Sequence, residues 1–259
     1  MRDLTPTRDL RLALVQSELA WHDPAANRAH FEALLTEVGE TDLIILPEMF
    51  TTGFSMVSAA LAEPADGPTA VWMREQAQRL GAVVTGSLIV RDADGQHRNR
   101  LLWATPDGEL QHYDKRHLFR MAGEHEHYAP GEQRLRVTLK GWRIRPLICY
   151  DLRFPVWSRA QDDTDLLLWP APRRGHWNRL LPARAIENLC YVAAVNRLGS
   201  DGNGHPYAGD SQVLDFQGEP LIEAGAEAGI FHTTLSAAAL TAYRERFPAQ
   251  RDADAFRLD

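Results

Sequence analysis

The chain has 259 residues, of which 44% are hydrophobic and 24% are charged, and its formal net charge at pH 7 is −7. These values are ordinary for a globular protein that buries a sizeable core without covalent staples. A negative net charge with scattered basic residues argues against nucleic acid or an anionic membrane as the main partner.

Two cysteines, Cys149 and Cys190, are too few for a disulfide framework. Charged residues interrupt the short apolar run near the N-terminus, unlike the continuous apolar region of a secretory signal. No segment approaches the ~18 apolar residues of a membrane span. We therefore expect a cytoplasmic protein with reduced thiols. Residues 1–259 are expected to form a single domain, with 248–259 as a candidate C-terminal arm.

Apolar or alternating runs bounded by turn residues predict the strands of the chain. In chain order they cover residues 10–16, 42–46, 82–90, 100–104, 110–113, 134–139, 142–148, 165–169, 191–195, 209–216, 219–223 and 230–234. Helices are predicted where apolar residues recur at helical spacing or where capping residues mark the ends. They cover residues 24–38, 68 to the stop at Gly81, 155–161 and 176–188, and a last helix follows Ser236. Strands that alternate with helices and hairpins indicate an α/β protein whose sheets are covered by helices.

Three of the predicted strands end in a reactive polar side chain. LIILPE ends at Glu48, LQHYDK at Lys115 and RPLIC at Cys149. Ligands of open α/β folds tend to bind beyond strand ends, so an acid, an amine and a thiol in these positions can meet in one pocket. Taken singly, each is ordinary: a solvated carboxylate, a solvated lysine or a core cysteine. Cys190 lies inside the apolar run NLCYVAAV and is interpreted as a core residue.

The segments around these three residues resemble those of a known family. LPEMF, YDKRHLF and LICYDLRFP are similar, in order and spacing, to the signature segments of the nitrilase superfamily of carbon–nitrogen hydrolases. The resemblance extends through residues 176–188, 196–202 and 209–219 and covers nearly the whole chain from about Arg8. It is closest to the bacterial omega-amidase branch. The resemblance implies a four-layer α-β-β-α sandwich that pairs into homodimers or larger homo-oligomers.

The resemblance also implies a division of roles. Cys149 is expected to be the nucleophile, Glu48 the general base, and Lys115 the oxyanion stabiliser together with the backbone N–H of Tyr150. These residue types suit the chemistry, because a free thiol with a pKa of about 8.5 must lose its proton before it attacks an unreactive amide. The positive charge of Lys115 is expected to favour the thiolate.

The reaction implied is hydrolysis of the terminal amide of 2-oxoglutaramate or 2-oxosuccinamate, which gives the acid and ammonia through a thioester without a cofactor. A second glutamate often supports the triad in this family. Glu124 lies seven residues before Gly131 and is expected to position Lys115 and the substrate amide, with Glu126 as the alternative.

A substrate with a distal carboxylate needs a cationic partner, and arginine forms bidentate pairs with carboxylates. Arg173, which follows a predicted strand, is assigned to that carboxylate. Phe119 and Trp177 are expected to form apolar walls of the pocket. The alternatives for the cationic partner are Arg174, Arg153 and Arg116.

Other interpretations stay open. His125, Glu126 and His127 carry metal-binding groups, but the H-E-x-x-H spacing is missing and no metal is expected. Two more histidines, His112 and His117, lie upstream. Ser211 in G-D-S lacks the second glycine of the G-x-S-x-G elbow of serine hydrolases. A non-catalytic scaffold on the same fold, or a nitrilase, carbamoylase or acyl-transferring relative, is also compatible with these segments.

Overall fold

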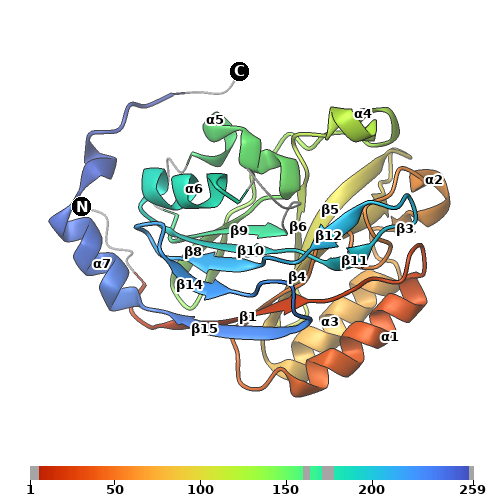
Figure 1. Ribbon diagram of the computed structural model, residues 1–259, viewed down its shortest axis with the longest axis horizontal. Helices are drawn as coiled ribbons and strands as arrows, with labels where there is room; N and C mark the ends of the chain where they lie inside the picture. Colours follow the sequence, from red (N-terminus) through yellow and green to blue (C-terminus); the bar gives the residue numbers. More distant parts are fainter. Residues whose placement is uncertain (1–5, 160–163, 171–177, 257–259) are drawn as a thin grey trace.

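The computed structural model describes residues 6–159, 164–170 and 178–256. Two β-sheets lie face to face, and helices cover the outer face of each sheet (Figure 1). Helices α1 (Pro24–Leu34) and α3 (Pro68–Leu80) cover one sheet, and α5 (Pro155–Ser158) and α6 (Leu180–Asn188) cover the other. The arrangement confirms the predicted α-β-β-α sandwich.

The first sheet is built mainly from the first half of the chain. Its strand order is β15-β1-β2-β4-β5-β6, with β3 also paired to β4. Its members are β1 (Leu10–Gln16), β2 (Leu43–Ile45), β3 (Glu63–Pro64), β4 (Val83–Arg91), β5 (His97–Ala104), β6 (Leu110–Asp114) and β15 (Gly229–Leu235). Strands β1, β2 and β4 are parallel, whereas β4, β5 and β6 form antiparallel hairpins. The hairpins bring the end of β6 beside the start of β5.

The second sheet follows the order β14-β13-β10-β9-β8-β7. Its members are β7 (Val137–Leu139), β8 (Trp142–Pro146), β9 (Leu166–Pro170), β10 (Tyr191–Val195), β13 (Gln212–Leu214) and β14 (Pro220–Glu223). A separate antiparallel pair consists of β11 (Leu198–Ser200) and β12 (Pro206–Ala208).

The remaining helices are short, except for the last. They are α2 (Ser58–Leu61), α4 (Glu124–His127) and α7 (Ala237–Arg246), with 3-10 helices at Leu35–Glu37, Arg120–Ala122, Cys149–Arg153 and Ala249–Arg251. The predicted boundary residues act as caps. The Asp23 side chain accepts a hydrogen bond from Ala26 N–H, and Gly81 ends α3 in the left-handed conformation at φ 62°. No helix in the described ranges is long and apolar enough to cross a bilayer.

The buried strands serve two cores at once. On β1, Leu12 and Leu14 belong to the core between the sheets, whereas Ala13 and Val15 belong to the core beneath α1 and α3. Successive side chains of a strand point to opposite faces, so a strand covered on both faces is apolar throughout. This explains why β2 is apolar throughout and why β1 is apolar except at Arg11 and Gln16.

Several predicted elements are shorter than expected. The run 142–148 leaves the sheet after Pro146, because the chain turns into the 3-10 helix at Cys149. The run 209–216 is a strand only over Gln212–Leu214, because Gly209 and Asp210 both have positive φ angles. Three other observed elements are shorter than predicted. The predicted strand 134–139 is observed as Val137–Leu139, the helix 155–161 as Pro155–Ser158 and the helix 176–188 as Leu180–Asn188. The two predicted helices lie partly outside the described residues.

The C-terminal segment leaves α7 and reaches back toward α5 (Figure 1). A hollow of about 370 Å³ is lined by Pro155, Val156, Arg159, Glu187, Asp252, Ala253, Asp254 and Phe256. The segment therefore borders, together with α5 and α6, a hollow on its own chain. A role for residues 248–259 as an arm between subunits stays a prediction.

Candidate active site

Glu48 lies in the turn that follows β2. Met49, the next residue, has a φ of 44°, a strained conformation for a non-glycine residue. Its N–H donates a hydrogen bond to Ser87 Oγ on β4 (2.9 Å), which holds the turn against the sheet. The turn packs so closely that a Cβ at Gly86 would lie 2.8 Å from the Cβ of Leu46. A glycine on β4 is therefore required for this placement of Glu48.

Lys115 directly follows β6 and is fixed through its backbone. Its N–H donates to the carbonyl of Asn99 on β5 (2.9 Å), and its carbonyl accepts from Gly131 N–H (2.9 Å). A Cβ at Gly131 would lie 2.2 Å from the carbonyl oxygen of Asp114, so only glycine permits this approach. The Lys115 side chain is completely buried.

The two glutamates converge on Lys115. Its Nζ donates to Glu48 Oε1 (2.9 Å) and to both carboxylate oxygens of Glu124 (3.0 and 2.9 Å). The Glu124 side chain has no exposed surface, and its Oε2 also accepts from Phe119 N–H (2.5 Å). Glu126 instead points outward from α4, with 69% of its side chain exposed. The structure thus brings Glu124, rather than the alternative Glu126, to Lys115.

The charges of the two glutamates explain why the fold tolerates the burial of Lys115. Burial alone would lower the pKa of Lys115, but the carboxylates of Glu124 and Glu48 outweigh it and raise that pKa well above the ordinary 10.5. Burial raises the pKa of Glu124, and Lys115 opposes that rise. Lys115 is consequently a permanent cation at neutral pH, paired with two acids.

Cys149 starts the 3-10 helix after β8 with a φ of 42°. A non-glycine residue in this region is strained, and such strain is common where a fold presents a functional group. Burial and the negative charge of Glu48 raise the pKa of the Cys149 thiol well above 9.0, although Lys115 lowers it. The thiol is also hydrogen-bonded to Glu48. Lys115 therefore lowers the pKa of the thiol, as predicted, but burial and Glu48 raise that pKa by more. The thiol consequently keeps its proton before the reaction.

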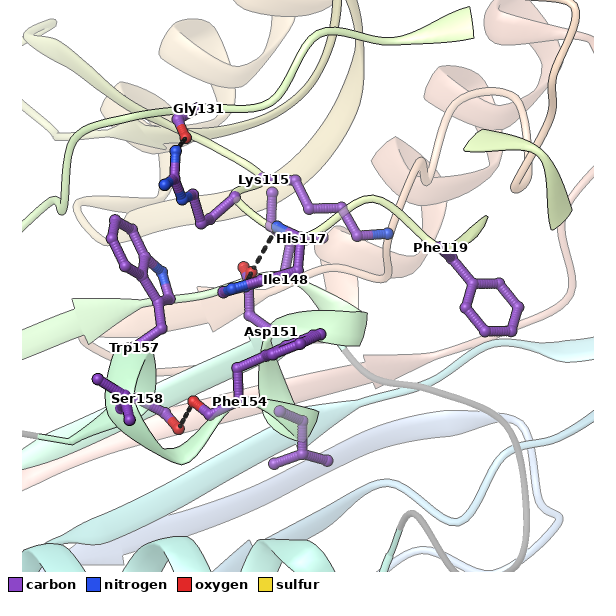
Figure 2. A network of polar contacts seen from close by, with 12 residues as sticks. Lys115, His117, Phe119, Gly131, Ile148, Asp151, Phe154, Trp157 and Ser158 are labelled. Atoms are coloured by element: carbon purple, nitrogen blue, oxygen red, sulfur yellow. Dashed lines mark hydrogen bonds and ion pairs between the residues drawn. The ribbon is translucent and has the colours of Figure 1, made fainter. Parts of the chain in front are cut away.

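A buried acid, Asp151, joins the Lys115 loop to the Cys149 turn (Figure 2). Its Oδ2 accepts from Ile148 N–H (3.0 Å) and from the hydroxyl of Tyr113 (2.7 Å). Its Oδ1 accepts from His117 N–H (3.0 Å) and lies 2.7 Å from His117 Nδ1. The residues bound are neighbours of Cys149 and Lys115 in sequence, so Asp151 fixes the distance between the two segments. No role of Asp151 is predicted from the sequence.

The other residues predicted for the site lie in different surroundings. The rings of Phe119 and Tyr150 are in edge contact, with centroids 5.1 Å apart. Arg116 donates to the carbonyl of Gly131 (3.1 Å) and lies over the ring of Trp157, which indicates a structural use. Arg153 is exposed. Arg173, Arg174 and Trp177, which the sequence assigns to the pocket or offers as alternatives, lie outside the described residues.

The structure also bears on the competing interpretations. Ser211 is completely buried, and its hydroxyl donates to Gln16 Oε1 (2.6 Å), so it ties two sheets together and is not a presented nucleophile. Cys190 is a core residue, as predicted, and burial raises its pKa to about 12. Over residues 6–159, 164–170 and 178–256, no three His, Cys, Asp or Glu side chains gather as a metal-binding group.

The different placement of the two glutamates gives a direct prediction. Glu124→Ala is expected to lower turnover about 100-fold, because Lys115 loses the partner that aims its Nζ and a displacement of about 1 Å has an effect of that size. Glu126→Ala is expected to retain activity, because its side chain is mostly exposed. Steady-state ammonia release by the two purified variants measures the difference, and equal activities would refute the role of Glu124.

Comparison with known proteins agrees with this geometry. Residues 11–245 match the carbon-nitrogen hydrolase family. The omega-amidase YafV of Escherichia coli (strain K12) is 51% identical over 254 residues, which cover 96% of this chain and 98% of that protein. The 2-oxoglutaramate amidase of Bacillus subtilis (strain 168) is 33% identical and covers 93% of this chain and 96% of its own length.

A solved structure is similar over its full length. A CN-hydrolase superfamily protein from Xanthomonas campestris, with an arsenic adduct in its active site, has a TM-score of 0.95 at 53% identity. The match covers 98% of this chain and 100% of that one. The family match, the relatives and the shared fold lead to one conclusion: the chain belongs to the carbon-nitrogen hydrolase family.

Proposed function

We propose that this protein is a thiol amidohydrolase that cleaves the terminal amide of a small 2-oxo dicarboxylic acid monoamide, such as 2-oxoglutaramate or 2-oxosuccinamate. The observation that carries the proposal is the buried Lys115, which is shared by Glu48 and Glu124 and interacts electrostatically with Cys149, whose φ angle is positive. A buried cation fixed next to a thiol and its base is the arrangement that acyl transfer from an amide needs.

In the first half of the reaction, Cys149 Sγ attacks the amide carbon while its proton passes to Glu48. The raised pKa of the thiol makes this base necessary, because little thiolate exists at neutral pH. Negative charge develops on the carbonyl oxygen and is stabilised by Lys115 Nζ and by the backbone N–H of Tyr150. The carbon–nitrogen bond then breaks, Glu48 returns its proton to the nitrogen, and ammonia leaves a thioester on Cys149.

In the second half, water replaces ammonia. Glu48 takes a proton from the water as its oxygen attacks the thioester carbon, and the same oxyanion stabilisers act again. The carbon–sulfur bond breaks, the sulfur recovers a proton from Glu48, and the carboxylic acid is released. Glu124 takes no proton in either half, and it keeps Lys115 in place through its two hydrogen bonds.

The names of the relatives support the choice of substrate, since they include omega-amidases and a 2-oxoglutaramate amidase. We assign the distal carboxylate of the substrate to Arg173, and one apolar wall of the pocket each to Phe119 and Trp177. A normal KM for 2-oxoglutaramate in Arg173→Ala would remove Arg173 from this role. Nitrilase or carbamoylase activity would use the same Glu-Lys-Cys chemistry with a differently shaped pocket.

The test is ammonia release by the purified protein from 2-oxoglutaramate, with succinamate, glutamine and a simple nitrile as comparison substrates. We expect the 2-oxo amide to be preferred by kcat/KM. Preference for the nitrile or for glutamine would replace the substrate assignment while leaving the chemistry of Cys149 in place.

The proposal includes a cytoplasmic location and assembly into a homodimer or larger homo-oligomer. Val156 on α5 and Ile186 on α6 are 50% and 52% exposed, and apolar side chains of this kind are suited to a subunit contact. Sedimentation of the intact chain beside one that ends at Phe247 measures whether residues 248–259 contribute to that contact.

A further inference from the structure

Asn99 lies on β5, next to the cluster formed by Lys115 and its two glutamates. Its side chain is 1% exposed and donates both available hydrogen bonds to acids. Nδ2 lies 2.8 Å from Glu48 Oε1 and 3.3 Å from Glu124 Oε1. The backbone carbonyl of the same residue accepts from Lys115 N–H (2.9 Å). Asn99 therefore contacts all three charged members of the cluster.

The remaining polar atom of Asn99 argues against a purely stabilising role. Its Oδ1 is buried and accepts no hydrogen bond from any of the described residues. A buried acceptor without a partner disfavours folding. Exchanging the positions of Oδ1 and Nδ2 would not help, because an acceptor would then face two carboxylates. The side chain is best explained by the two bonds that it donates.

These bonds divide the oxygens of Glu48 into two kinds. Oε1 accepts from both Asn99 Nδ2 (2.8 Å) and Lys115 Nζ (2.9 Å), so its accepting directions are occupied. We propose that Asn99 is a positioning residue that locks the Glu48 carboxylate through Oε1 and thereby presents Oε2 to the Cys149 thiol. This inference rests on the proposed function only in taking Glu48 as the base of Cys149.

The same geometry gives a reason for an amide at this position. Two acids share one lysine, so carboxyl groups outnumber cations in the cluster. A second cation on the Glu48 side would compete with the thiol proton for the carboxylate. A neutral amide holds both acids by hydrogen bonds and leaves the basicity of Oε2 available for catalysis.

The test measures the base directly, without a substrate. Alkylation of Cys149 by iodoacetamide is followed by mass spectrometry of its peptide, from about pH 6 to about pH 10. The variants are Asn99→Ala, Asn99→Leu, which keeps the side-chain size, and Glu48→Gln. Asn188→Ala and Asn188→Leu are matched controls, because Nδ2 of buried Asn188 also donates two hydrogen bonds, to the carbonyls of Ser158 and Arg184.

We expect both Asn99 variants to alkylate about tenfold more slowly than wild type at neutral pH, the factor that corresponds to about 1.4 kcal/mol. The deficit should narrow as the pH rises, because hydroxide then removes the thiol proton and the base is no longer needed. With the preferred amide, kcat should fall by a similar factor while KM stays within about twofold. The Asn188 controls should show neither change.

Two results would overturn the inference separately from the proposed function. Wild-type alkylation rates in the Asn99 variants, with slow alkylation in Glu48→Gln, would remove Asn99 and keep Glu48 as the base. An equal deficit in the Asn188 variants would make the effect a general loss of packing. Wild-type rates in Glu48→Gln would instead overturn the assignment of the base itself, and the role of Asn99 with it.

Discussion

Cys149→Ala is expected to abolish amide hydrolysis, with a loss of at least about four orders of magnitude in kcat. No other described thiol can replace it, because Cys190 is in the core and its pKa is raised to about 12. The folded state should survive the change, since alanine keeps the backbone of the turn and removes only the sulfur and its hydrogen bond to Glu48. Ammonia release and the thermal unfolding midpoint measure the two effects.

The matched control is Cys190→Ala. It removes the other thiol from the core and is expected to lower stability by about 1 kcal/mol through the small cavity that it leaves, with kcat unchanged. If Cys149→Ala kept measurable turnover, or if Cys190→Ala lost it, the assignment of the nucleophile would be wrong.

Lys115→Ala is expected to have the second largest effect. Removal of an oxyanion stabiliser lowers kcat by about 100- to 1,000-fold, whereas substrate binding should change much less. The variant also leaves Glu48 and Glu124 without their shared cation in a buried site. Breaking a buried ion pair in this way destabilises a protein by about 3–5 kcal/mol. Turnover at saturating amide and the free energy of unfolding in urea measure both losses.

The pH dependence of this stability follows from the raised pKa of Lys115. Because the folded pKa lies above the ordinary 10.5, the stabilisation is fully present below that value and is lost only as the pH rises through the folded pKa. The stability difference between wild type and Lys115→Ala should therefore be constant between about pH 7 and about pH 9 with respect to this group. The control is Arg116→Ala, which removes the cation next to Lys115 in the sequence. Unchanged turnover in Lys115→Ala would refute the role of Lys115 as oxyanion stabiliser.

The segments that present the site were predictable because each is a local signal. Asp23 caps the start of α1 and Gly81 caps the end of α3, and both caps depend on local sequence alone. The apolar run before Glu48 likewise indicates a buried strand. The run before Cys149 was predicted as strand to its end, but the sheet stops at Pro146. Hydrophobic pattern alone does not reveal a turn in which buried apolar residues such as Ile148 still take part.

Asn99 and Asp151 escaped prediction for a different reason. In the sequence, Asn99 lies just before the predicted strand 100–104, between Arg98 and Arg100, and no local signal distinguishes it from other polar residues near a turn. Its partners Glu48 and Glu124 are 51 and 25 positions away. The pairing of β5 with both β4 and β6, together with the turn after β2, brings them together, and that pairing cannot be deduced from local patterns.

The two ends of the β5–β6 hairpin differ in how far their amino-acid sequence can change. At one end, Asn99 and Lys115 are held opposite each other by the register of the strands, in which Arg100 pairs with Asp114. A slip of one residue would turn every side chain of β6 to the other face. At the other end, the turn between Ala104 and Leu110 is largely exposed, and the hydrogen bonds of Thr105, Asp107 and Glu109 stay within it. Insertions acquired during evolution, or peptides grafted by an engineer, are therefore expected to be tolerated at residues 106–108 and not within the strands themselves.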